Sequence, residues 1–175
     1  MEKNETLVMR ADRVLFMKVG EECHRMKGFT AGTKNMNPTE YTRKYIDETF
    51  ERTTPTGMSV SIDFTFDMMK GNPVHEALAE IIDGEKLGSA SVVTLVEVMF
   101  DKMEEDGKIP AIMRDFSVIG STAGDGTDAY VYSGAFRVEG DREEIIATAV
   151  NAEGETLTGE KAKDAETITI ASTGV

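Results

Sequence analysis

The clearest pattern in the chain is a strict alternation of apolar and polar side chains over residues 58–68. The apolar positions are Met58, Val60, Ile62, Phe64, Phe66 and Met68, and the polar positions are Ser59, Ser61, Asp63, Thr65 and Asp67. A period of two predicts a β-strand with one apolar and one polar face, about 36 Å long at ~3.3 Å per residue. The polar face carries no positive charge. A strand with one wet face suits a hairpin or a barrel wall.

The segment that follows has the period of an amphipathic helix. Asn72 is a typical N-cap, Pro73 suits the first helical position, and Gly84 can end the helix. Between them the apolar residues form one stripe at helical spacing: Val74, Ala77, Leu78, Ile81 and Ile82. We therefore expect one helix over about 73–83 that packs against a sheet.

The rest of the chain is rich in strand patterns separated by turn residues. The expected strands fall within 8–19, 91–100, 116–119, 130–139, 145–150 and 167–171. The glycine-rich stretch 120–128 is expected to be a loop. We predict a single, mainly β domain over 1–175, with an antiparallel sandwich or barrel-like fold and one flanking α-helix.

One long stretch, residues 27–57, is less regular than its surroundings. It contains Gly28, Gly32, Pro38, Pro55 and Gly57, which interrupt any helical or strand period. We expect an extended arm or a long loop there.

Charge and composition narrow the function. The chain has 32 acidic and 19 basic residues, for a net charge of −13. Tight binding to nucleic acid is excluded, because that affinity comes mainly from Lys and Arg at phosphates. A surface that repels phosphate could still serve as a conduit. The one cysteine, Cys23, excludes an internal disulfide framework. No apolar run reaches the length of a membrane span or a secretory signal, so we expect a soluble protein made in the cytoplasm.

Two histidine-containing segments are weak candidates for chemistry. Cys23 and His24 are adjacent, and neighbouring residues of a strand point to opposite faces, which places them poorly for proton transfer. His75 lies in the first turn of the expected helix, where a role at the helix start or an interface is favoured over metal binding. With only two His in the chain, a His-rich metal site is excluded.

Two acidic segments also fail as sites. Asp63 and Asp67 lie four residues apart on one strand face, roughly 13 Å, whereas paired catalytic carboxylates lie ~5–10 Å apart. The segment 124–128 has the glycines and aspartates of a turn, but the twelfth residue from Asp125 is Phe136 rather than the Glu of a calcium loop. We expect no catalytic residue, no metal site and no cofactor.

Several segments together resemble one known family. They are 40–48, the alternating strand 58–68, and the segments 70–75, 114–118, 124–128 and 133–136. Their order and spacing resemble the tail tube (major tail) proteins of tailed phages, especially those of Gram-positive hosts. The likeness runs from about residue 8 to residue 150, and no single motif in it is specific.

The resemblance implies a sandwich-like subunit with a flanking helix. Six subunits would form a ring whose inner strands join into one closed barrel, and rings would stack into a hollow tube. Ser59, Ser61, Asp63, Thr65 and Asp67 would then face the lumen, with the Met58–Met68 face on the subunit core. The opposite placement of the polar face, on the tube exterior, stays open. Residues 1–10 and 27–57 would make inter-ring contacts, with Met36, Tyr41, Tyr45 and Phe50 between subunits.

The function implied is mechanical. The tube would let DNA pass without specific binding, or would puncture a membrane in a DNA-free particle. Its partners would be further copies of itself, with sheath, tape measure, tail terminator and baseplate proteins as other candidates. It would reside in a virion tail or tail-like particle after assembly in the bacterial cytoplasm. The sequence does not separate contractile from non-contractile tails. The alternatives are a small-ligand-binding β-barrel and, least supported, an enzyme.

Overall fold

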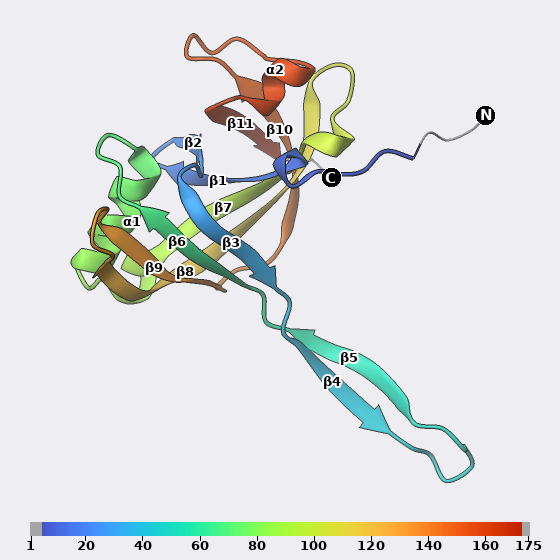
Figure 1. Ribbon diagram of the computed structural model, residues 1–175. Coiled ribbons are helices and arrows are strands. Elements are labelled where there is room, and N and C mark those ends of the chain that lie inside the picture. The colour runs from blue at the N-terminus through green and yellow to red at the C-terminus, as the bar shows by residue number, and fades with distance from the viewer. Residues whose placement is uncertain (1–4, 173–175) are drawn as a thin grey trace.

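The computed structural model describes residues 5–172, and β-strands dominate it (Figure 1). The strands are β1 Arg13–Val19, β2 Glu22–Arg25, β3 Phe29–Asn35, β4 Pro38–Arg43, β5 Arg52–Met58, β6 Ser61–Asp67, β7 Val92–Met99, β8 Lys108–Asp125, β9 Val131–Val138, β10 Glu143–Val150 and β11 Thr167–Ser172. The helices are α1 Pro73–Asp83 and the single turn α2 Glu160–Lys163. Short 3₁₀ turns lie at Arg10–Asp12, Gly88–Ser91 and Phe100–Lys102. The prediction of a mainly β, barrel-like antiparallel fold is confirmed.

Six strands close into a barrel. They follow the order β10-β11-β2-β1-β7-β8, and β10 pairs with β8 to complete the ring. Closure removes free edges, which otherwise promote aggregation. The interior is filled by apolar side chains, among them Phe16, Val98, Ile109, Ala147 and Ile168. The barrel is therefore a packed core.

A second layer extends the sheet beyond the barrel. The second half of β8 pairs with β9, β9 with β6, and β6 with β3. A second core lies between this extension, α1, and the outer faces of β1 and β7. Its largest fully buried side chains include Phe64, Phe66 and Phe136. Because neighbouring residues of a strand face opposite ways, Phe16 fills the barrel whereas Met17 fills the second core.

The helix matches its expected bounds. The Asn72 side chain accepts hydrogen bonds from the backbone N–H groups of Val74 and His75, at 3.1 and 3.3 Å, which satisfies donors that a helix start leaves open. Val74 and Leu78 are fully buried against the sheet. From β9, the Tyr132 hydroxyl donates to the Asp83 carboxylate at 2.6 Å. Burial and this acceptor raise the pKa of Tyr132 to about 12.

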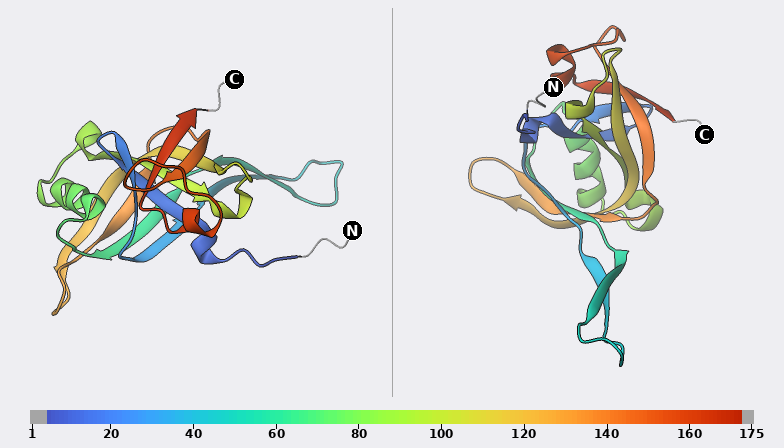
Figure 2. Two further views of the ribbon diagram at one scale, coloured as in Figure 1. Left: turned by 90° about the horizontal axis from the view of Figure 1, so that it is seen from above. Right: turned by 90° about the vertical axis from the view of Figure 1, so that its right-hand side faces the viewer.

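A two-stranded hairpin projects from the body. Strands β4 and β5 pair only with each other among the described residues, and every residue of both is exposed. The hairpin points away from the rest of the molecule in each view (Figures 1 and 2). The turn between β8 and β9 is a second, shorter protrusion (Figure 2).

The expected 58–68 strand is not continuous. Met58 ends the hairpin, where it pairs with Pro38, and Ser61 starts β6, where it pairs with Asn35. Asn37 makes the break: its φ is 43°, and its side-chain amide donates to the Ser59 carbonyl at 2.9 Å and to the Ser61 hydroxyl at 3.2 Å. Met58, predicted to face the core, is exposed for this reason.

Two loop assignments are also wrong. Residues 120–125 continue β8 through two register shifts, so the glycines there bend a strand. Residues 29–35, expected within an arm or loop, form β3 of the main sheet. Only the stretch after Asn35 forms an arm, and that arm is the hairpin.

Candidate assembly surfaces

The outer side of the extended sheet is a polar face built from four strands. Pairing places Thr33 and Ala135 beside Asp63, and Ala31 and Ser133 beside Thr65. We define the polar face as Thr33, Asn35, Asp63, Thr65, Asp67, Thr122, Ser133 and Arg137. Its side chains are mostly short, and they bond along the face: the Asn35 amide donates to Asp63 at 2.9 Å, and the hydroxyls of Thr122 and Ser133 lie 2.5 Å apart.

The five residues predicted to face a lumen divide between this face and the kink. Asp63, Thr65 and Asp67 lie together on the polar face, half-buried or exposed. Ser59 is exposed in the kink between β5 and β6. Ser61 is only 3% exposed under the Asn37 side chain, so its predicted place on a solvated face is wrong for the single chain.

The alternation over residues 58–68 did not reveal the positive charge on this face, because that charge comes from another strand. Arg137 of β9 pairs with Ser61 and is exposed. Arg137 belongs to this face because of the register between β6 and β9, which cannot be read from the sequence. Asp63 and Asp67 outnumber it within the polar face.

The extended sheet has an open edge at each side. β3 pairs with β6 alone among the described strands, and at Gly32 the carbonyl on its free side accepts from the Arg10 guanidinium, at 3.5 Å. At the other side, β7 pairs with β8 only as far as Ser117. Residues 119–125 of β8 therefore pair with β9 alone. Unpaired edges are templates for adding a further strand.

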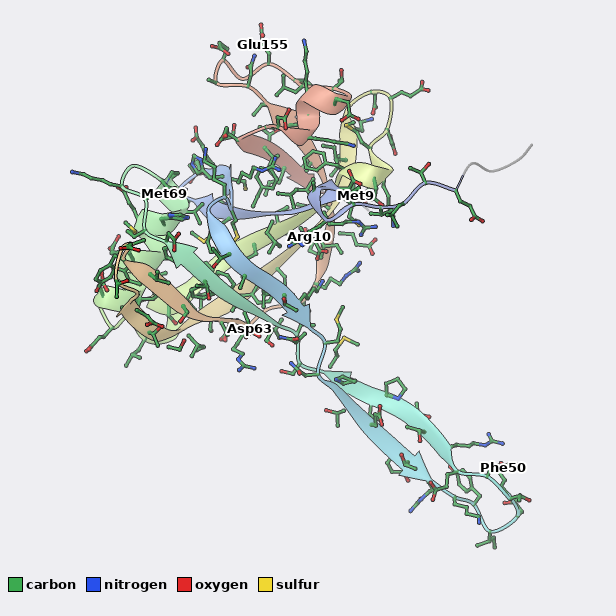
Figure 3. All side chains as sticks on the ribbon, in the orientation of Figure 1. Met9, Arg10, Phe50, Asp63, Met69 and Glu155 are labelled. Atoms are coloured by element: carbon green, nitrogen blue, oxygen red, sulfur yellow. The ribbon has the colours of Figure 1, made fainter. Side chains whose placement is uncertain are left out.

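The hairpin carries five of the 13 large apolar side chains that are exposed among the described residues. Tyr41 lies on β4, and Tyr45, Ile46 and Phe50 lie at the far end (Figure 3). Phe50 is 82% exposed. The structure thus brings three predicted inter-subunit residues together on one hairpin, whereas Met36 lies at its root. Ile46 was not among the predicted inter-subunit residues, although it is the sequence neighbour of Tyr45, which was.

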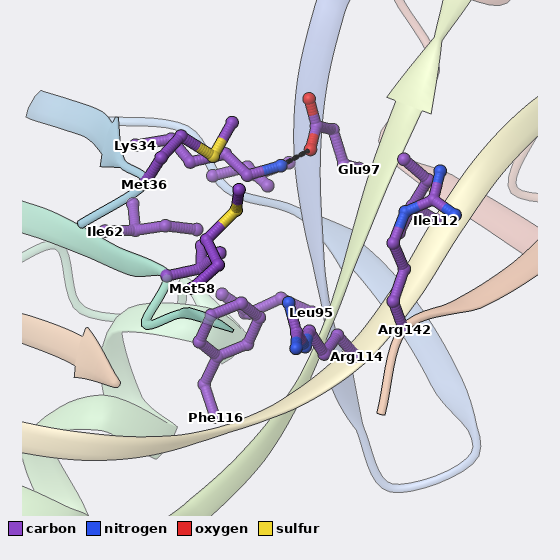
Figure 4. A pocket seen from close by; sticks show the side chains of 12 residues that line it. Lys34, Met36, Met58, Ile62, Leu95, Glu97, Ile112, Arg114, Phe116 and Arg142 are labelled. Atoms are coloured by element: carbon purple, nitrogen blue, oxygen red, sulfur yellow. Dashed lines mark hydrogen bonds and ion pairs between the residues drawn. The ribbon is translucent and has the colours of Figure 1, made fainter. Parts of the chain in front are cut away.

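A cavity of about 170 Å³ lies at the hairpin root, between β3, β6, β7 and β8 (Figure 4). Its apolar lining includes Leu15, Met36, Met58, Ile62, Leu95 and Phe116. Its charged lining consists of Lys34, Glu97, Arg114 and Arg142. The Lys34 ammonium lies 2.8 Å from the Glu97 carboxylate, and the Arg114 side chain donates to the Gly140 carbonyl at 2.8 Å. Sequence patterns did not identify this cluster, because it joins four segments distant in the chain.

The buried His75 side chain of α1 hydrogen-bonds to the segment that precedes β3. Its Nδ1 accepts from the Met69 backbone N–H at 3.2 Å, so Nε2 carries the proton and donates to the Lys27 carbonyl at 2.8 Å. The ring is fully buried and lies against Phe66, 4.5 Å between centroids. Burial lowers the pKa of His75, against the raising effect of the Lys27 carbonyl and Asp67. His75 thus contacts Met69 just before the helix and also Lys27 just before β3.

Cys23 and His24 lie on β2, within the barrel wall. Cys23 is buried in the barrel core, where burial raises the pKa of the thiol. The imidazole of His24 lies 3.3 Å from the Glu22 carboxylate. Within residues 5–172, no cluster of three or more His, Cys, Asp or Glu side chains could hold a metal ion. No helix among these residues is both long and apolar enough to cross a bilayer.

Comparisons with known proteins add a distant structural likeness. No protein-family model and no curated protein matches the chain. A chain in the cryo-EM structure of the anti-feeding prophage (AFP) baseplate is similar, with a TM-score of 0.47 and 7% identity. The match covers 80% of this chain and 96% of that one. A likeness this remote does not indicate a role.

Proposed function

We propose that the chain is a structural subunit of a phage or phage-like tail particle, and that copies of it form a tube wall. The observation that carries the proposal is the pair of open edges on one sheet, at β3 and at residues 119–125 of β8. Head-to-tail pairing of these two edges joins the sheets of neighbouring copies. A contact between two different surfaces closes into a ring when the rotation permits.

The composition of the polar face supports its placement on the inside of such a ring. Short Ser, Thr and Asn side chains leave space, and Asp63 and Asp67 repel phosphate. The net charge of −13 acts in the same sense. DNA would then pass without adhering, and Arg137 would be the cation it meets on this face. In a particle without DNA the same wall would serve as a stiff puncturing core.

The hairpin supports stacking of rings. Its strands have no core of their own, and Tyr45, Ile46 and Phe50 are exposed at its end. Exposed apolar groups on a projecting element are typical of a surface that a partner covers. Residues 5–9, which include Leu7 and Met9, are exposed as well, and residues 1–4 lie outside the described part of the chain. Hexameric rings, other tail proteins as partners and a place in the particle follow from this proposal.

Electron microscopy of the purified chain tests the proposal. Rings or tubes about 100 Å wide are expected, from six domains of ordinary size. Gly32→Pro should abolish them, because proline removes an outward N–H from the β3 edge. Gly32→Ala is the matched control, since an added Cβ there meets its nearest side-chain atom at 3.7 Å. Monomers at every concentration of the wild type would refute the proposal, and ligand binding in a thermal-shift screen would favour the barrel alternative.

A further inference from the structure

The cavity at the hairpin root combines an apolar floor with a cationic rim. Lys34 pairs with Glu97 and Arg142 with Glu144, at 2.8 Å each, whereas Arg114 donates to a backbone carbonyl (Figure 4). The rim thus has three cations and two carboxylates. In a chain whose acidic residues outnumber its basic ones by 13, such a local excess of positive charge is unusual. The cavity is therefore suited to an apolar group that is flanked by carboxylates.

The size and the mouth of the cavity fit one aromatic ring. A cavity of about 150 Å³ in another protein holds benzene, and this one measures about 170 Å³. Met36 and Met58 line the mouth and are about half exposed. Methionine side chains adapt readily to an incoming group.

The hairpin end has the matching chemistry. Residues 44–52 contain three carboxylates, Asp47, Glu48 and Glu51, and two basic residues, Lys44 and Arg52. Glu48 is ion-paired with Arg52, so Asp47 and Glu51 are the carboxylates considered for an external contact. Phe50 lies among them, is 82% exposed, and is larger than the other strongly exposed apolar side chain there, Ile46. A phenyl ring flanked by acids complements an apolar cavity with a basic rim.

The hairpin cannot fill the cavity of its own chain. Met36 and Met58 lie at its root, whereas Phe50 lies at its far end (Figure 3). Six paired positions separate root from end, which at ~3.3 Å per residue is about 20 Å. A hairpin tip that fills this cavity must therefore belong to another molecule.

We propose that Phe50 of one copy inserts into the root cavity of a second copy, with Asp47 and Glu51 facing Arg114 and Arg142. The inference rests on the proposed self-assembly and names its receptor. Tip and cavity are different surfaces, so each copy offers a tip to one neighbour and a cavity to another. Head-to-tail contacts that do not close into a ring propagate along an open stack, as stacking of rings requires.

Disulfide trapping tests the contact directly. The Thr49→Cys and Met58→Cys variants, both of which keep the Phe50 ring, are mixed, oxidised and run on a non-reducing gel beside each variant alone. Intermolecular disulfides are expected in the mixture, because insertion brings the two backbones to the ~4.4–6.8 Å that a disulfide spans. The native Cys23 is buried and does not compete. Leu87→Cys, at a position 85% exposed on the body, replaces Thr49→Cys as the control and should give no more dimer when mixed with Met58→Cys than when oxidised alone.

A binding measurement supplies the second readout. Phe50→Ala should weaken self-association on the order of tenfold or more, as loss of a buried aromatic anchor does, whereas Leu87→Ala should not. Arg142→Glu should also weaken it, and Glu51→Arg in the same chain should restore part of the loss.

The outcomes separate this inference from the proposed function. Rings or tubes without the 49–58 disulfide, and with Phe50→Ala assembling normally, overturn the docking while the tube stands. A specific 49–58 disulfide without rings supports the docking and refutes the tube. Failure of both the disulfide and wild-type self-association overturns both.

Discussion

The hairpin β4–β5 and the sheet strands β6 and β9 are all antiparallel pairs, yet they differ in what their side chains contact. Each residue of the hairpin strands is exposed, whereas Phe64, Phe66 and Phe136 of the sheet are at most 2% exposed. The hairpin is held by backbone pairing and small local contacts, such as the Thr42 and Thr53 hydroxyls 2.9 Å apart. Arg43 adds a contact over the Tyr41 ring, at 5.7 Å.

This difference separates two uses of apolar residues in one chain. An isolated two-stranded hairpin is marginal in water, so the hairpin depends on the body for its position and gives the body little stability in return. Its aromatic groups are therefore free to serve an interface. Substitutions in the packed sheet should therefore reduce the stability of the chain far more than substitutions in the hairpin.

Removing a core ring should cost far more than removing a hairpin ring. Phe136 is fully buried and its ring centroid lies 4.6 Å from that of Phe64. Phe136→Ala should lower the free energy of unfolding by ~3–5 kcal/mol, because it deletes contacts and leaves a cavity. Phe50→Ala should change it by less than about 0.5 kcal/mol. Urea denaturation of the unassembled chain measures both, and equal losses would contradict the division.

Adding one methyl group should distinguish the two regions in the same way. A Cβ on Gly134 of β9 would lie 2.3 Å from the Ile119 carbonyl oxygen and 2.9 Å from the Phe64 ring. Gly134→Ala should therefore destabilise by about 1–3 kcal/mol through overpacking. A Cβ on Gly57 of the hairpin meets Thr39 at an ordinary 3.7 Å. Thermal unfolding of Gly57→Ala should match the wild type, and a large loss there would show that the hairpin is packed.

The third prediction concerns pH at the junction of the two regions. The folded state holds His75 neutral, with a pKa below its usual value. Its contribution is thus complete above the unfolded pKa of about 6.5 and is lost as pH falls through the lower folded pKa. Unfolding free energies at pH 7.5 and 5.5 should differ more in the wild type than in His75→Gln.

His75→Gln should lower the free energy of unfolding at pH 7.5 by about 1–3 kcal/mol, because the Gln side chain does not reproduce both hydrogen bonds of the buried ring. Leu78→Ala, at a fully buried position of the same helix, removes no titratable group and is the control that should keep the wild-type pH dependence. An unchanged slope in His75→Gln would contradict the role of this ring.

Prediction from sequence succeeded where the signal was local. The helix over 73–83 was found from its cap and its stripe, which are set by neighbours within a few turns. The alternation was correct within β6, where Ile62, Phe64 and Phe66 are buried. The likeness to tail tube proteins stays a proposal, as do the lumen and inter-subunit roles of its residues.

Failures came where distant segments decide the backbone. Glycines at 120 and 124 predicted a loop, but pairing with β9 keeps those residues in β8. The break after Met58 depends on hydrogen bonds from Asn37, a residue that the alternation never included. The cavity likewise exists only because distant segments pack together, which brings Lys34, Arg114 and Arg142 to one lining.

The sequence by itself determined the β-rich composition of the chain, its capped helix and the polar and apolar sides of β6, because hydrophobic period and capping chemistry act over a few residues. Only the tertiary structure decided that the barrel closes through β10 and β8, that the hairpin stands clear of the body, and that its root holds a cavity. Those features depend on strand register between distant segments, and register is chosen by the packing of the whole core rather than by any one stretch of sequence.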